Sequence, residues 1–257
     1  SGKQNTTYES QKDVYYLMFE DLKTAIAILT ATVASTPEAN AYGAGDMIYN
    51  GSVINWLKFA NTLRLRLAIR ISNVDSAKAK TEAEAAATGI TMDETSDDAF
   101  LDVSQWNTSG NGLARVNPWY TSLMSASMES FLKGFEDPRM QHYFEAVAEG
   151  PYSTDPQLPA ELRANVGGYH GMANGYQTTL EDNFRYCYSC LNTTRWSAAN
   201  IMTEPIPIMY AAETHFLKAE GAWRGWNMGG GNTQSYYEKG ITVSMQQWGI
   251  SSAEIQS

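Results

Sequence analysis

The order of apolar and polar residues predicts a helix near the start of the chain. A Ser10-x-x-Asp13 pattern resembles a capping box, in which side chains satisfy the free N–H groups of a helix N-terminus. Behind it, apolar residues recur every three or four positions, as on one face of a helix. The stripe consists of Tyr15, Met18, Phe19, Leu22, Ile26 and Leu29. We therefore predict a helix over about residues 10–30.

Two patterns compete in the next apolar segment. Residues 63–72 alternate strictly between apolar and other side chains, which taken alone predicts a half-buried strand. Trp56, Phe59 and Leu63 instead follow helical spacing, and the Leu, Arg and Ala residues around them are good helix formers. We therefore favour a helix here. An Ala/Lys/Glu-rich helix follows, so helices are expected over about residues 52–88. The Lys78–Glu82 spacing of its charges is typical of a solvated helix face.

Three arginines, Arg64, Arg66 and Arg70, lie within this apolar segment. A buried guanidinium group costs free energy unless it is paired, so these residues require partners elsewhere in the chain. On a helix, Arg66 and Arg70 share a face while Arg64 points elsewhere. We expect Glu213 to pair with one arginine, and we assign the cluster a structural role.

Residues 207–248 predict two more helices, joined by a Gly-rich turn at residues 229–232. Small residues stand where the two backbones would approach each other, as in a tetratricopeptide unit. These residues are Ala219, Gly221, Ala222 and Gly240. The earlier helices could pair in the same way.

Residues 89–204 lack this regularity. Gly, Asn, Ser, Thr and Pro are frequent there, and aromatic residues are scattered. Helical spacing returns only over residues 119–131, and residues 151–175 read as a long loop. Long loops inside a compact domain are usually functional. We predict a mainly helical (all-α) fold, in a single domain over residues 1–257, with one loop-rich ligand face.

Composition limits the classes of function. The 257 residues are 43% hydrophobic and 18% charged, which is typical of a folded protein. The net charge of −10 excludes a nucleic-acid partner, since that would require a basic surface. The chain has no apolar run of about 20 residues, the length that spans a bilayer, and no signal peptide at its start.

The candidate chemical motifs are weak. Cys187 and Cys190 form a C-x-x-C pair, but the three histidines are far away in sequence and no strand precedes the pair. Packing cysteines and a local disulfide both remain open. Glu213 and Glu220 could be mistaken for a glycosidase carboxylate pair, but such pairs flank a groove and these two share one packing helix. We therefore expect no enzymatic activity, no metal and no cofactor.

Three ordered segments resemble the SusD/RagB family of outer-membrane nutrient-binding lipoproteins. They are Asp13 to Ala25, the arginine-rich segment Tyr49 to Ser72, and Pro207 to Trp226, which Tyr236 to Gly249 extends. The resemblance implies a helical fold with tetratricopeptide-type pairs and a loop-rich glycan-binding face. It also implies a lipid anchor in the outer leaflet of the outer membrane, facing outward, and a TonB-dependent SusC-like transporter as partner. Family members begin with an anchor cysteine and run past this chain's end, so we expect a fragment.

A sugar-binding site needs aromatic faces, on which the apolar face of a pyranose stacks, and polar groups that bond its hydroxyls. The irregular region offers both, although packing beneath a loop is the competing role for each aromatic. The candidate ligand-binding residues are Trp196, Tyr169, Tyr176, Arg195 and Asn192. We predict non-catalytic capture of an oligosaccharide and its delivery to the transporter. The alternative is a helical-repeat scaffold that binds peptides or protein partners.

Overall fold

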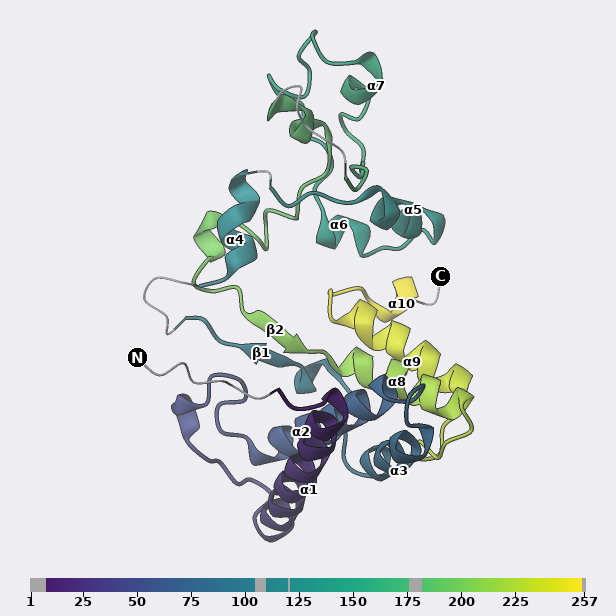
Figure 1. Cartoon of the computed structure of the whole chain (residues 1–257). Coiled ribbons are helices and arrows are strands. Elements are labelled where there is room, and N and C mark those ends of the chain that lie inside the picture. Colours follow the sequence, from purple (N-terminus) through teal and green to yellow (C-terminus); the bar gives the residue numbers. More distant parts are fainter. Residues whose placement is uncertain (1–7, 105–109, 120, 176–181, 256–257) are drawn as a thin grey trace, which may run out of the picture. The chain divides into compact units, whose positions relative to one another are not determined.

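The computed structural model describes residues 8–104, 110–119, 121–175 and 182–255, which are mainly helical (Figure 1). The chain forms two compact units. The first contains the residues up to Phe100 together with Pro207–Ser244, and the second contains Leu101–Ile206 together with the residues from Met245 on. The mainly helical fold is confirmed, whereas the single domain over residues 1–257 stays a prediction.

The first unit is built from long helices. They are α1 (Gln11–Ser35), α2 (Val53–Arg70), α3 (Ser76–Ala87), α8 (Ala211–Trp223) and most of α9 (Thr233–Gln246), with 3-10 turns η1 (Gly43–Gly45) and η2 (Thr95–Asp97). Two short strands, β1 (Ala99–Leu101) and β2 (Ile206–Met209), pair with each other. The strand alternative for residues 63–72 is wrong, because this stretch is helical to Arg70.

Helix α2 is the central element of this unit, with α1 and α3 packed against it (Figure 1). The side chain of Ser10 caps α1 by accepting a hydrogen bond from the N–H of Asp13 at 3.1 Å, as the sequence predicts. Phe19 of α1 and Leu65 of α2 are fully buried in the shared core. Alanines on α3 complete that core, and their small size allows α3 to lie close to α2.

The arginines of α2 have different environments. Arg64 is buried and bonds Glu82 of α3, which is also fully buried. The solvated face expected around Glu82 is therefore wrong at that position. Arg66 forms a two-point ion pair with Glu213 of α8, at 2.6 and 2.5 Å, so the expected pairing of Glu213 is confirmed. Arg70 is exposed and bonds no residue in the described part of the chain.

Helices α8 and α9 show why small residues stand between them. A Cβ atom added at Gly240 would lie 2.8 Å from the ring of Phe216, so only glycine allows this contact without a shift of the ring. Gly221 has another neighbour, since a Cβ there would lie 2.4 Å from the sulfur of Met228. The contact at Gly240 is thus between a ring of α8 and the backbone of α9, and the predicted approach of the two backbones stays a prediction.

The second unit has short elements connected by long irregular segments. They are α4 (Gly112–Val116), η3 (Asn117–Trp119), α5 (Ala126–Gly134), α6 (Met140–Tyr143), α7 (Ala160–Arg163), η4 (Asp182–Cys187), η5 (Ala198–Asn200) and α10 (Ser252–Ile255). The helix expected over residues 119–131 begins only at Ala126. Residues 123–125 pair instead with distant segments, since the N–H of Met124 donates to the carbonyl of Ser189.

Backbone pairing organises the middle of this unit. Residues 143–145 run antiparallel to residues 190–192, through hydrogen bonds from Glu145 to Cys190 and from Asn192 to Tyr143. On the other side, the N–H of Val147 donates to a carbonyl in the segment that leads to Tyr169. Residues far apart in the sequence thus meet at one place. Cys187 and Cys190 are both buried here and are not joined in a disulfide.

No helix in the described ranges combines the length and the apolar character that crossing a membrane requires.

Candidate ligand-binding groove

An open groove of about 620 Å³ lies in the second unit. It is lined by Gln141, His142, Tyr169, Asn192, Thr194, Arg195, Gln247 and Trp248. Three of the five residues predicted from the sequence, Tyr169, Asn192 and Arg195, therefore lie together. They come from two stretches of the chain, and the end of α6 and the residues that follow α9 complete the lining. Tyr176 lies outside the described residues.

Asn192 shapes the rim of the groove. Its side-chain oxygen accepts hydrogen bonds from the backbone N–H groups of Thr194 and Arg195, at 2.9 and 3.3 Å. Its amide nitrogen donates to the carbonyl of Gln141 at 2.9 Å. This side chain thus ties the loop after residue 192 to α6, and most of its bonding capacity is used within the protein.

Arg195 is held in place by a carboxylate and two rings. Its Nε donates to Glu204, which balances the positive charge. The guanidinium carbon lies 4.3 Å from the ring centre of Trp248 and 5.1 Å from that of Trp196. Cation–π attraction stabilises this arrangement. The groove therefore contains a neutralised arginine whose remaining N–H groups can meet a ligand.

Trp196 lies behind the groove. Its side chain is only 9% exposed, and its carbonyl accepts a hydrogen bond from the buried side chain of Asn117. Its ring centre lies 5.8 Å from that of Trp248, which does line the groove. Tyr143 meets Trp248 edge-on at 4.5 Å. A stacking role for Trp196 stays a prediction, but its burial favours a supporting one, with the half-buried Trp248 as the ring that lines the groove.

Tyr169 is half-buried beside the apolar cluster of Met124, Leu132 and Phe144. Burial raises the pKa of its hydroxyl, and the negative charge of Glu145 raises it further. The hydroxyl is therefore neutral at physiological pH and can donate a hydrogen bond. Tyr169 and Trp248 together supply the aromatic surface of the groove.

Several polar groups of the groove have no partner within the protein. The side chains of Gln141, Gln247 and Thr194 make no hydrogen bond to any residue in the described ranges. No acidic residue is among the lining residues named above. The groove therefore offers neutral donors and acceptors next to aromatic rings, the combination that binds uncharged, hydroxyl-rich molecules.

The two glutamates that resembled a catalytic pair have other partners. Glu213 bonds Arg66, and Glu220 bonds Arg224, the residue just after α8, at 2.7 Å. Within the described parts of the chain, no three His, Cys, Asp or Glu side chains gather into a group that could hold a metal ion.

These features define a mainly helical protein with an aromatic groove built on loops. The family model described as Susd and RagB outer membrane lipoprotein matches residues 1–256, and the chain belongs to this family. The resemblance seen in the sequence is thereby confirmed. Membership assigns the protein to the outer membrane.

Solved structures of family members support the assignment. A SusD-like protein from Bacteroides thetaiotaomicron VPI-5482 is 36% identical, with a TM-score of 0.78, over 99% of this chain and 48% of that one. A chitin-binding SusD homologue from Flavobacterium johnsoniae is 38% identical, with a TM-score of 0.78, over 97% of this chain and 48% of that one. A homologue from Bacteroides vulgatus ATCC 8482 is 30% identical, with a TM-score of 0.81, over 99% and 48% of the two chains. The chain thus spans about half the length of these relatives. None of the curated proteins matches it.

Proposed function

We propose that the protein captures an oligosaccharide outside the cell and passes it, unaltered, to a TonB-dependent SusC-like transporter in the outer membrane. In this proposal a lipid anchor holds the full-length protein at the outer face of that membrane. The observation that supports the proposal most strongly is the groove, which combines Trp248 and Tyr169 with unpaired amide and hydroxyl groups.

The groove suits a sugar for physical reasons. The C–H face of a pyranose is apolar and slightly positive, and it packs on the negative face of an aromatic ring. Gln141, Gln247 and Thr194 can then bond hydroxyl or acetamido groups around the ring. An uncharged ligand also fits the balanced charge of Arg195.

The absence of catalysis is part of the proposal. Glycoside hydrolysis generally requires two carboxyl groups on either side of the scissile bond. The groove lining has no carboxylate among the described residues, and Glu213 and Glu220 are engaged in ion pairs elsewhere. The groove therefore supports binding without cleavage.

Calorimetric titration tests the proposal. Oligomers of N-acetylglucosamine are the first ligands to test, because two similar solved proteins bind chitin. Cellotetraose and maltotetraose extend the series, and a mixture of unstructured peptides serves as the comparison. Binding to the peptides and to no saccharide would favour the scaffold alternative instead.

A pair of tryptophan variants identifies the binding surface. Trp248→Ala should weaken saccharide binding by roughly 1–3 kcal/mol, by analogy with the loss of one base-stacking ring. Trp223→Ala is the matched control, because that ring is 73% exposed on α8 in the other unit. Gln247→Ala adds a variant that leaves the aromatic packing intact. Equal affinities in all three variants would contradict the assignment of the groove.

A further inference from the structure

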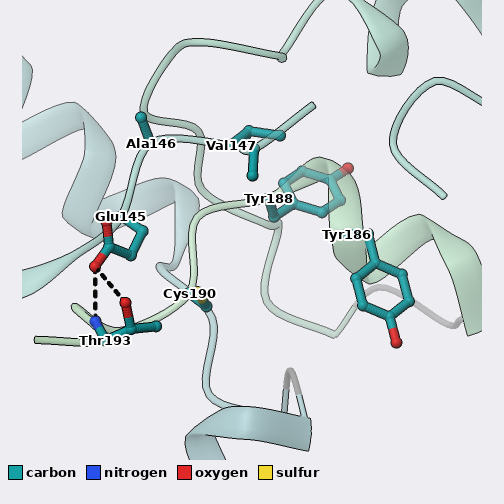
Figure 2. Close-up of a pocket in the computed structure, with 8 residues that line it drawn as sticks. Glu145, Ala146, Val147, Tyr186, Tyr188, Cys190 and Thr193 are labelled. Carbon is teal, nitrogen blue, oxygen red and sulfur yellow. Dashed lines mark hydrogen bonds between the residues drawn. The ribbon is translucent and has the colours of Figure 1, made fainter. Parts of the chain in front are cut away.

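A second, smaller pocket of about 180 Å³ lies in the same unit as the groove (Figure 2). Its lining residues are Glu145, Ala146, Val147, Ala148, Tyr186, Tyr188, Cys190 and Thr193. Figure 2 shows Val147, Tyr188 and Tyr186 along one side and the side chain of Glu145 bonded to Thr193 on the other. The pocket is therefore apolar and aromatic, with a single carboxylate.

The pocket and the groove share one backbone scaffold. Asn192 lines the groove, whereas Glu145 and Cys190 line the pocket, and all three belong to the paired segments 143–145 and 190–192. Side chains two residues apart on a strand point to the same face, about 7 Å from each other. Cys190 of the pocket and Asn192 of the groove are thus expected on one face of this pair, at a distance that one sugar residue can bridge.

The carboxylate of Glu145 is fixed in one orientation. Its Oε1 accepts hydrogen bonds from the backbone N–H of Thr193 at 2.7 Å and from the Thr193 hydroxyl at 2.9 Å. Its Oε2 accepts no hydrogen bond from any residue that the structure describes. This second oxygen is therefore an acceptor that is already oriented, and a hydroxyl group can donate to it.

The aromatic side of the pocket is also supported. The ring of Tyr186 stacks on that of Tyr152, with centres 4.7 Å apart and planes inclined by 20°. The guanidinium of Arg185 lies 5.1 Å from the centre of the Tyr186 ring. These contacts limit movement of the ring that faces the cavity.

We propose that this pocket holds the terminal residue of the oligosaccharide whose other residues occupy the groove, with hydroxyls of that terminal residue donating to Oε2 of Glu145. The inference rests on the proposed function and specifies the ligand further. The carboxylate selects a terminal residue that is neutral and has free hydroxyls, and it disfavours one that carries an acidic group.

Glu145→Gln is a precise test, because it retains one oxygen for Thr193 and replaces the free acceptor with an NH₂ donor. Tyr186→Ala removes the aromatic side of the pocket. Glu161→Gln, an exposed glutamate of α7, is the matched control. Calorimetry uses N-acetylchitotetraose, cellotetraose and maltotetraose, and melting temperatures verify the fold of each variant. We expect affinity for the saccharide that binds to fall roughly tenfold or more in Glu145→Gln, the scale of one hydrogen bond to a charged group.

A blocked ligand tests the terminal position. Two derivatives are made of the tetrasaccharide that binds the wild type. One carries a bulky fluorophore at its reducing end and the other carries it at its non-reducing end. One of the two derivatives should bind the wild type at least about tenfold more weakly, by loss of the same contact. If neither Glu145→Gln nor Tyr186→Ala alters the affinity while Trp248→Ala reduces it, the proposed role of the pocket is overturned. The assignment of the groove then remains intact. Equal binding of both blocked ligands overturns the terminal position. A wild type that binds no saccharide overturns the proposed function as well.

Discussion

Oε2 of Glu82 on α3 accepts two hydrogen bonds from the guanidinium of Arg64 on α2, at 2.8 Å from Nε and 2.5 Å from Nη2. The other carboxylate oxygen lies 2.8 Å from Lys78 and 3.1 Å from Lys23 of α1. One fully buried carboxylate thus joins three helices of the first unit. A carboxylate stays charged in a fully buried position only when nearby cations offset the cost of its desolvation.

Removal of the arginine should destabilise this unit. Arg64→Ala should lower the free energy of unfolding by about 3 kcal/mol, near the lower end for a broken buried pair, because two lysines still face Glu82. Arg70→Ala is the control, since that side chain is exposed, and should change stability by less than about 0.5 kcal/mol. Urea unfolding measures both. Equal losses in the two variants would contradict the distinct roles of the arginines.

Acid should weaken the same contact. Burial alone would raise the pKa of Glu82, but hydrogen bonds from Lys78, Arg64 and Lys23 outweigh it and lower the pKa from 4.5 to about 2. The folded pKa is below the unfolded one, so the stabilisation is complete above about pH 4.5 and is lost as the pH falls toward 2. We expect a loss of about 3 kcal/mol over this interval. The stability difference between wild type and Glu82→Gln should therefore shrink between pH 6 and pH 3, and a constant difference would rule out this account.

Trp196 should behave as a core residue. Its side chain is 9% exposed and supports Trp248, so Trp196→Ala should cost about 3–5 kcal/mol of stability. Thermal unfolding measures this loss. The sequence instead predicts Trp196 as a ligand-binding residue that stacks on a sugar. An unchanged melting temperature with abolished saccharide binding would restore that role.

Gly171 should be intolerant of any side chain. A Cβ atom there would lie 2.3 Å from the carbonyl oxygen of Ser125, where the two backbones pass each other. Gly171→Ala should therefore destabilise the second unit by roughly 1–3 kcal/mol. Gly150→Ala is the matched control, because no atom lies within 4 Å of its added Cβ. Similar denaturation midpoints for the two variants would show that the backbone can separate at little cost.

The helices of the first unit could be predicted from the sequence because their signals are local. The stripe behind Ser10 repeats at helical spacing, and in residues 52–72 the helix formers outweighed the alternation. The burial of Glu82 could not be predicted from such local signals. In sequence it belongs to a run of lysines and glutamates, and only the approach of Arg64 from another helix buries it.

Part of the lining of the candidate groove could be predicted from the sequence. Tyr169, Asn192 and Arg195 stand in the irregular region where polar and aromatic residues concentrate, and they do line the groove. Trp248 was not among the predicted site residues, because it lies in the predicted helical stretch 207–248, which was assigned to the scaffold. Its one local signal was Gly249, whose positive φ of 75° lies in the turn just after α9. Its contact with Arg195 depends on tertiary structure, which periodicity does not encode.

Asn192 has a consequence for the speed of binding. Its side chain forms its bonds to Thr194, Arg195 and Gln141 in the free protein, so the arriving ligand meets a rim that needs no ordering step. Encounter with such a surface is limited mainly by diffusion and orientation, and differences among ligands then appear in their dissociation rates. If the proposed transfer to a transporter holds, residence time is therefore the property that substitutions along this rim would change.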